Sequence, residues 1–238
     1  MPRPARFGIA GVPQHIIQRG NNRQPTFFAD EDYRFYIDCL IEAKRKYDCL
    51  VHAYVLMTNH VHLLTSAEDI QNVSRMMQHL GRRFVRYVNS KYRRTGTLWE
   101  GRFKASLVDS EHYYLRCCRY IENNPVRAGI VCDPAGYAWS SYRFHAFGRE
   151  DELVTAHGLY QCLGNRPEER QLRYRDSFKT ELGEPTLREI RETVNGGWPL
   201  GSERFKDETA RVLQRVTRPP KRGRPKKDFV SGKLEVLL

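Results

Sequence analysis

The chain has 238 residues, of which 40% are hydrophobic and 29% are charged, and its mean hydropathy is −0.66. No apolar run approaches the roughly 20 residues of a membrane-spanning helix, and the N-terminus lacks the apolar segment of a signal peptide. Forty Lys and Arg against 28 Asp and Glu give a net charge of +12, which attracts polyanions, nucleic acid first. We therefore expect a cytoplasmic protein without a membrane partner.

The cysteines argue against stabilisation by disulfides or by zinc. The six cysteines form no Cys-x-x-Cys pair, and most of them lie among apolar residues. Neither a disulfide framework nor a zinc finger has that pattern. We expect reduced, buried thiols.

The first half of the chain predicts alternating strands and helices. Residues 12–19 favour a strand, and Asp30 is a plausible N-cap for a helix over 31–48. Residues 49–57 and 60–65 predict a β-hairpin with its turn at Thr58-Asn59.

The next three elements are a long helix, a strand and a shorter helix. Residues 69–92 carry the clearest helical apolar stripe, and residues 99–108 alternate like a strand. A helix over 111–124 follows, capped by Asp109 or Ser110 and ended by Pro125.

The order β-α-β-β-α-β-α is that of a ferredoxin-like or RRM-like α+β fold, an antiparallel sheet with helices on one face. The period of two along strand 60–65 places His60 and His62 on one face and Val61 on the other. We expect the helices to cover the Val61 face. The opposite face would then be open and would carry the histidines together with Arg102 and Lys104.

The C-terminal part predicts a helical appendage, with helices over 167–182, 186–194 and 202–216. The last two flank a glycine-rich turn, as in a DNA-binding helix-turn-helix, but helices that merely pack against each other are at least as common. We predict a catalytic domain over 1–147 and a helical region over 148–217.

Residues 218–238 predict a flexible basic tail, because they begin with a polar and proline-rich stretch. The segment Arg222-Gly223-Arg224-Pro225 resembles an AT-hook, whose arginines enter the narrow minor groove of A·T tracts. The alternative is a tail that is merely basic. We expect Arg222 and Arg224 to contact DNA.

Basic residues and aromatic rings are interleaved along residues 75–104, where Lys and Arg outnumber acids nine to one. Cations for phosphates beside flat rings for bases suit single-stranded nucleic acid. The alternative is a solvated basic helix whose rings lie in the core, and we favour it for Phe84 and Tyr87. The candidates for phosphate contact are Arg82, Arg86, Arg102 and Lys104.

The candidate catalytic residues lie on the second hairpin strand and on the helix over 111–124. A His-x-His pair such as His60 and His62 does not by itself indicate a catalytic site. The same pattern occurs where two histidines are hydrogen-bonded in a core or bind zinc. Tyr120 and Asn124 change this balance, because residues four apart share one face of a helix. Two imidazoles, an amide and a phenol together form the donor set of a metal-assisted nucleophile.

Three segments, in this order along the chain, resemble the IS200-like single-tyrosine (Y1) transposases of the HUH superfamily. More narrowly, the chain resembles the REP-associated tyrosine transposases, over roughly residues 5–145. The segments are Asn59-His60-Val61-His62-Leu63-Leu64, Trp99-Glu100-Gly101-Arg102-Phe103-Lys104 and Arg119-Tyr120-Ile121-Glu122-Asn123-Asn124-Pro125-Val126-Arg127-Ala128-Gly129.

The resemblance implies that His60 and His62 bind Mg²⁺ or Mn²⁺ and that Tyr120 is the nucleophile. Asn124 would supply the third side-chain ligand, at a position where many simpler relatives have glutamine. The implied substrate is single-stranded DNA with a REP-like palindromic hairpin, cleaved and rejoined through a 5′-phosphotyrosine link. The implied enzyme is bacterial, cytoplasmic and nucleoid-associated, and it is a monomer or homodimer.

Two other functions would use the same residues. A hairpin-binding regulator or domesticated relative would keep the +12 charge and the basic segments without turnover. A zinc hydrolase would use His60 and His62 but give Tyr120 no covalent role, and no further ligand lies at obvious spacing near His60. The spacing also leaves open whether Tyr120 acts with the histidines of its own chain or of a partner.

Overall fold

The structure, a computed structural model, describes residues 6–219 and is built on a four-stranded antiparallel sheet. Its strands are β1 (Gln14–Arg19), β2 (Cys49–Met57), β3 (His60–Ala67) and β4 (Lys104–Leu107). They lie in the order β2-β3-β1-β4, which is the ferredoxin-like arrangement. The predicted α+β fold class is confirmed.

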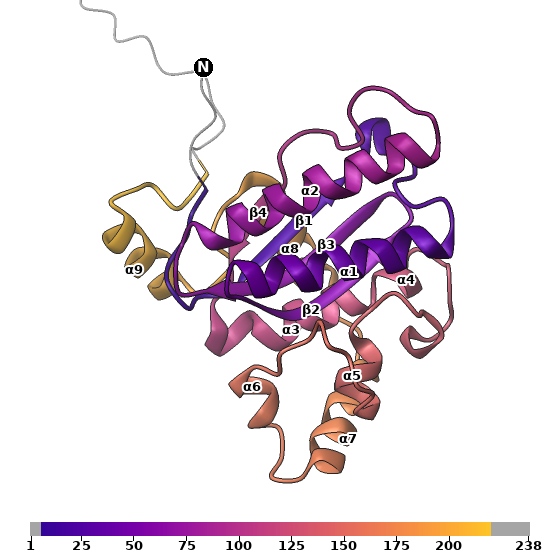
Figure 1. Cartoon of the computed structure of the whole chain (residues 1–238). Coiled ribbons are helices and arrows are strands. Elements are labelled where there is room, and N and C mark those ends of the chain that lie inside the picture. Colours follow the sequence, from indigo (N-terminus) through magenta and orange to yellow (C-terminus); the bar gives the residue numbers. More distant parts are fainter. Residues whose placement is uncertain (1–5, 220–238) are drawn as a thin grey trace, which may run out of the picture.

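Two helices, α1 (Asp30–Lys46) and α2 (Asn72–Lys91), cover one face of the sheet (Figure 1). Val61 and Leu63 of β3 are buried there, in one core with Leu40 of α1 and Leu80 of α2. The alternation of β3 explains this face, because every second side chain of a strand points the same way.

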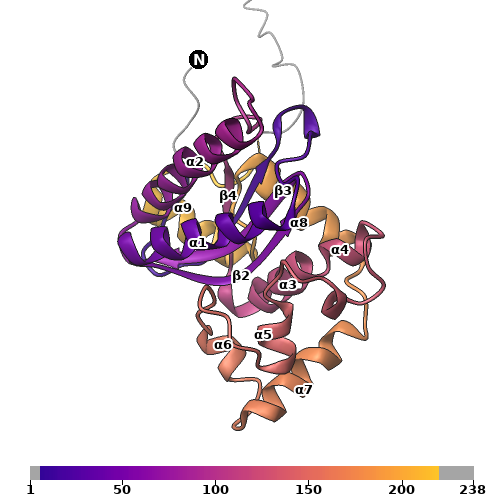
Figure 2. The ribbon, with the colours of Figure 1, turned by 45° about the vertical axis from the view of Figure 1, so that its right-hand side comes forward.

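The second face of the sheet is also covered, and the expectation of an open face was wrong. Two helices, α3 (Ser110–Glu122) and α8 (Glu184–Gly196), pack on this side, α3 against β2 and β3 and α8 against β4 and β1 (Figure 2). Leu64 of the sheet shares a core with Tyr114 and Ile121 of α3 and Ile190 of α8. The apolar stripe of α3 needs burial, and the first face is already filled by α1 and α2.

A further layer of short helices lies beyond α3 and contains α5, α6 and α7 (Figure 1). Glu122, a fully buried residue of α3, ties this layer to the fold by accepting hydrogen bonds from His145, Ser141 and Tyr174. Residues on both sides of position 147 therefore share one core, and the predicted domain boundary stays a prediction. The remaining elements are η1 (Asn21–Arg23), α4 (Asn124–Arg127), η2 (Pro134–Gly136), α5 (Tyr142–Phe147), α6 (Gly158–Gln161), α7 (Pro167–Phe178) and α9 (Glu203–Leu213).

Two predicted helix starts differ from the structure because acidic side chains near them have other partners. The N-cap of α1 is Ala29, not Asp30, while the carboxylate of Asp32 accepts from the Phe28 and Ala29 N–H groups. Helix α2 begins three residues late, because Asp69 accepts from the Gln71 N–H in a turn.

Two elements near the candidate site, β4 and α3, are shorter than predicted, whereas β3 extends to Ala67. The strand expected over 99–108 shrinks to β4, because the chain bends at Gly101, whose φ of 140° favours glycine. Asp109 caps α3 as predicted, but α3 ends at Glu122. Pro125 then lies in the first turn of α4, where its missing N–H costs nothing.

Two remaining sequence expectations concern the thiols and the membrane. All six cysteines are free, but only four are buried, and Cys132 and Cys162 are exposed. No helix within residues 6–219 is long and apolar enough to cross a membrane.

Candidate active site and nucleic-acid interface

Strand register places the two histidines of β3 beside basic residues of β1 and β4. His60 is paired with Arg19 and His62 with Ile17, and Ile17 is in turn paired with Lys104. Residues opposite each other in neighbouring strands point to the same face. His60, His62 and Lys104 therefore share one face, as the alternation indicated, and the two imidazole centroids are 5.1 Å apart.

The tautomer of His60 is fixed by its neighbour in the hairpin turn. Nδ1 of His60 is 2.7 Å from Oδ1 of Asn59, and an amide oxygen only accepts hydrogen bonds. The proton is therefore on Nδ1, and Nε2 keeps its lone pair. Burial, assisted by the charge of Arg19, lowers the pKa of His60 to about 4, which keeps the ring in the neutral form that binds metals.

His62 is deeper, only 2% exposed, and it contacts a histidine that the sequence analysis missed. Nδ1 of His62 is 2.8 Å from Nε2 of His15 on β1. Burial, with smaller effects of His15 and His60, holds the pKa of His62 well below its usual value. The missed signal was a third histidine on a predicted strand, and only the register of β1 against β3 reveals the contact.

Tyr120 reaches the same place from α3 on the covered face of the sheet. Its ring centroid lies 5.8 Å from that of His62, and its side chain is 5% exposed. Burial raises the pKa of the phenol, while the charges of Arg127 and Arg191 oppose that rise. The Arg127 guanidinium carbon lies 4.4 Å from the Tyr120 ring centroid.

Asn124 begins α4, one residue after the cap of α3. Its Nδ2 donates to the carbonyl oxygens of Tyr120 and Ile121, at 2.9 and 3.0 Å. Because carbonyl oxygens only accept, the amide nitrogen must face the helix end. Oδ1 is thus the atom of Asn124 that is left for another partner.

The candidate donors do not form a closed zinc site. Within residues 6–219, no three or more His, Cys, Asp or Glu side chains gather as a metal cluster. A closed tetrahedral zinc site needs four such ligands, whereas Mg²⁺ and Mn²⁺ accept amide oxygens and retain water. Of the candidate ligand atoms, Oδ1 of Asn124 is an oxygen donor, and the Nε2 atoms of His60 and His62 are nitrogen donors.

Comparison with known proteins gives the family of this part of the chain. Residues 10–124, which carry both histidines, Tyr120 and Asn124, match the family model described as transposase IS200 like. They belong to the IS200-like transposase family. No curated protein sequence matches the chain.

Two solved structures resemble this chain. A REP-associated tyrosine transposase bound to a REP hairpin has a TM-score of 0.54 and 20% sequence identity, over 66% of this chain and 93% of that one. This likeness shows the fold. A Deinococcus radiodurans R1 protein assigned as a transposase has a TM-score of 0.36 and 22% identity, over 51% and 97% of the two chains, and carries no structural argument.

The residues predicted to contact phosphate line two adjoining cavities. The cavity beside the sheet, of about 470 Å³, is lined by Arg19, Arg102 and Lys104. The larger one, of about 1040 Å³, is lined by Arg82 and Arg86 of α2 and again by Arg102. The predicted phosphate contacts omitted four further basic residues that line one or both cavities, namely Arg6, Arg19, Arg75 and Arg215.

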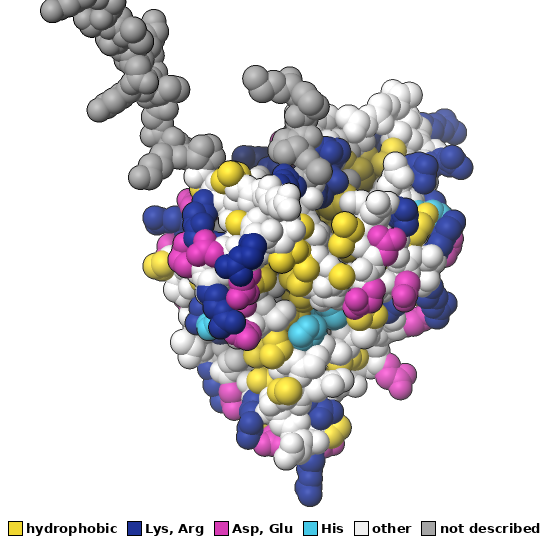
Figure 3. Space-filling view, turned by 90° about the vertical axis from the view of Figure 1, so that its left-hand side faces the viewer, with side chains coloured by type: hydrophobic (Ala, Val, Ile, Leu, Met, Phe, Trp, Pro, Cys, Tyr) yellow, Lys and Arg dark blue, Asp and Glu magenta, His cyan; other side chains and the backbone are white. Residues whose placement is uncertain are grey.

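Positive charge does not dominate the whole surface. Figure 3 shows a face on which Lys and Arg are interspersed with Asp and Glu. The candidate phosphate contacts are therefore better described by the two cavities than by the net charge. The tail arginines Arg222 and Arg224 lie outside the described residues.

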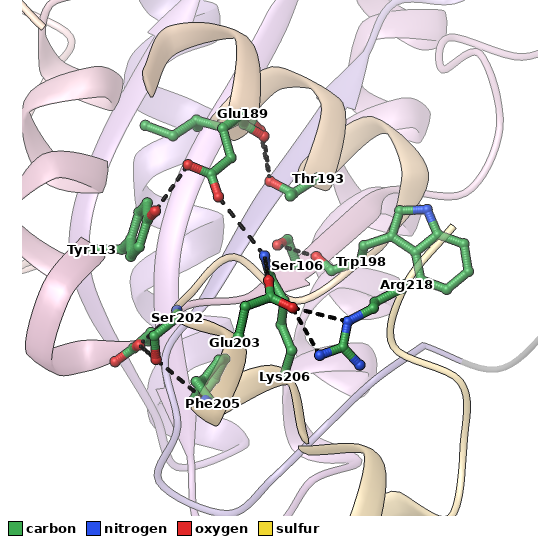
Figure 4. Close-up of polar contacts among 12 residues, drawn as sticks. Ser106, Tyr113, Glu189, Thr193, Trp198, Ser202, Glu203, Phe205, Lys206 and Arg218 are labelled. Carbon is green, nitrogen blue, oxygen red and sulfur yellow. Dashed lines mark hydrogen bonds and ion pairs between the residues drawn. The ribbon is translucent and has the colours of Figure 1, made fainter. Parts of the chain in front are cut away.

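The C-terminal helices are anchored directly next to the candidate site (Figure 4). Tyr113 of α3 donates to Glu189 of α8 at 2.9 Å, and Ser106 of β4 donates to the Trp198 carbonyl at 2.5 Å. Lys104, which shares the face of the histidines, donates to Asn195 of α8 at 3.2 Å. Helix α8 thus packs directly on the sheet and on α3, and its role in a DNA-binding helix-turn-helix stays a prediction.

Proposed function

We propose that this chain is a metal-dependent single-strand DNA endonuclease and strand transferase acting on REP-like hairpins. The observation that supports this most is the position of Tyr120, whose ring lies 5.8 Å from that of His62 in the same chain. A buried phenol next to two neutral imidazoles suits covalent phosphoryl transfer. The similar fold solved with a REP hairpin supports the substrate class.

In this proposal, His60 and His62 through Nε2 and Asn124 through Oδ1 hold Mg²⁺ or Mn²⁺. The bound ion supplies polarisation and orientation of a scissile phosphate oxygen. The chain's own nucleophile performs the transfer: the bond from the Tyr120 phenol oxygen to phosphorus forms, and the bond from phosphorus to the 3′ oxygen breaks. The phenol proton passes to solvent, and the leaving 3′ oxygen takes a proton from solvent.

The product is a 5′-phosphotyrosine and a free 3′-hydroxyl. A phosphodiester at Tyr120 conserves the energy of the broken bond, so a 3′-hydroxyl that attacks the same phosphorus rejoins DNA without ATP. Arg127 and Arg191 favour the reacting phenolate against the effect of burial. The Tyr120 ring contacts His62 of its own chain, which supports cleavage within one protomer, whether monomer or homodimer.

The test is incubation of the full chain with single-stranded hairpins from its flanking genome and Mn²⁺, followed by a denaturing gel. We expect a covalent DNA adduct that Tyr120→Phe abolishes while hairpin binding is retained. Tyr113→Phe, which changes another tyrosine of α3, is the matched control and should leave the adduct in place. Undiminished cleavage by Tyr120→Phe would rule out the assigned nucleophile.

A second function, a hairpin-binding regulator without turnover, is favoured by one observation. Tyr120 is only 5% exposed on a sheet face that α3 and α8 cover. A regulator would bind hairpins tightly and yield no adduct with either Mg²⁺ or Mn²⁺. The same gel, run beside a binding measurement, separates the two functions.

A further inference from the structure

His15 of β1 lies next to the two β3 histidines but outside the three segments that carry the family resemblance. It is 0% exposed, and its ring meets that of His62 edge to edge, with centroids 5.1 Å apart and 24° between the planes. Its ring centroid is also 5.7 Å from that of Tyr120. His15 thus contacts both the inner histidine and the nucleophile.

The contact between His15 and His62 is a hydrogen bond between two buried rings, His15 being 0% and His62 2% exposed. Two neutral imidazoles whose nitrogens are 2.8 Å apart share one proton, which either ring can donate. The assignment of that proton decides which nitrogen of His62 is free.

Only one of the two assignments leaves His62 ready to bind a cation through Nε2. If Nδ1 of His62 donates to Nε2 of His15, Nε2 of His62 keeps its lone pair. In the reverse arrangement, His62 carries its proton on Nε2 and cannot ligate there. Asn59 imposes the first arrangement on His60, since its Oδ1 can only accept.

We propose that His15 is a positioning residue, which accepts the Nδ1 proton of His62 and thereby holds its Nε2 toward a divalent cation. The inference rests on the proposed function, in that it takes His62 as a metal ligand. Partners that orient metal-binding histidines in this way commonly affect metal affinity almost as much as the ligands themselves.

The other nitrogen of His15 supports a role beyond packing. Nδ1 of His15 is buried and has no hydrogen-bond partner among the described residues. An unpartnered buried polar atom is unfavourable, and an apolar side chain would fill the same space without that penalty. A histidine at this position is therefore better explained by its Nε2, the atom that faces His62.

The experiment measures Mn²⁺ affinity of the full chain without DNA, from the paramagnetic resonance signal of free Mn²⁺. His15→Leu removes the acceptor, whereas His15→Gln keeps an acceptor oxygen. The matched control is His52→Gln, because His52 is also buried on the sheet but is bonded to Ser66 and Thr155. Melting temperatures recorded in EDTA report the effect of each change on folding alone.

We expect His15→Leu to raise the Mn²⁺ dissociation constant about 10- to 100-fold and His15→Gln to raise it much less. His52→Gln should lower the melting temperature and leave the dissociation constant unchanged. If His15→Leu does not fold, His15→Phe keeps an aromatic ring without the acceptor and gives the same comparison.

Wild-type Mn²⁺ affinity in folded His15→Leu would overturn the inference, as would an equal loss in His52→Gln. His60→Ala separates this failure from failure of the proposed function. If His60→Ala abolishes Mn²⁺ binding while His15→Leu does not weaken it, only the role of His15 is wrong. If His60→Ala leaves Mn²⁺ binding unchanged, the metal site itself is wrong, and the proposed function fails with it.

Discussion

Nδ1 of His145 on α5 donates a 2.7 Å hydrogen bond to Glu122 on α3, and both side chains are fully buried. Glu122 lies two residues after Tyr120, and its second carboxylate oxygen accepts from Tyr174 of α7. The helix that carries the nucleophile is therefore fixed to the C-terminal helices by one acidic side chain. This relationship makes the stability of α3 depend on chain that lies beyond the matched family segment.

We expect Glu122→Leu to lower the free energy of unfolding by several kcal/mol, because each buried donor left without an acceptor costs about 1 to 3 kcal/mol. Three donors, on Ser141, His145 and Tyr174, would lose their acceptor. Urea unfolding followed by circular dichroism measures the change. Glu150→Gln, at an exposed position, is the control, and equal stability of the two variants would contradict the assigned role of Glu122.

A second expectation concerns the acid side of the stability profile. Burial lowers the pKa of His52 to about 4, although its hydrogen bond to the Thr155 carbonyl opposes the shift. The unfolded chain binds the proton near pH 6.5, so this group's contribution is complete above pH 6.5 and is lost as the pH falls toward 4. The loss is at most about 3 kcal/mol.

The stability difference between the wild type and His52→Gln should therefore narrow as the pH falls from 6.5 to 4. Denaturant unfolding at several pH values gives that difference directly. The other buried histidines are present in both proteins, so their pH-dependent contributions to the free energy of unfolding cancel in this difference. A difference that stays constant with pH would show that His52 does not titrate on unfolding.

The sequence predicted the shared face of His60, His62 and Lys104 because alternation along a strand is a local property. It could not predict His15, because the contact with His62 depends on the register of two strands separated by a helix. The sequence also did not predict that α3 and α8 cover the histidine face. An amphipathic pattern shows that one face of a helix is buried, but not which part of the protein that face packs against. The strand predicted over 99–108 is longer than β4, because the alternation of side chains continues through the bend at Gly101 and does not reveal it.

A third prediction concerns the two basic cavities. Arg82→Gln and Arg102→Gln should each weaken hairpin binding and reduce the slope of log affinity against log salt by about 0.7, the value for one phosphate contact on a single strand. Fluorescence anisotropy at several salt concentrations measures both quantities. Arg149→Gln, at an exposed position that lines neither cavity, should leave the slope unchanged. If all three variants had the same slope of log affinity against log salt, the residues that line the cavities would not be the ones that contact DNA phosphates.

The last prediction concerns Arg191, which α8 contributes beside the nucleophile. Burial raises the pKa of Tyr120, whereas the positive charges of Arg127 and Arg191 lower it. Loss of Arg191 should therefore raise the pKa of Tyr120 further. Arg191→Gln should then slow adduct formation at neutral pH, about tenfold for each pKa unit, and the deficit should shrink as the pH rises.

Rates of adduct formation between pH 7 and 10, at saturating hairpin, measure this deficit. Arg188→Gln changes an exposed arginine of the same helix and controls for net charge. Arg191→Lys keeps the charge and should retain more of the rate than Arg191→Gln. A deficit in Arg191→Gln that is the same at every pH would mean that Arg191 acts on DNA binding or on folding, because a residue that promotes the phenolate becomes dispensable once the phenol is ionised.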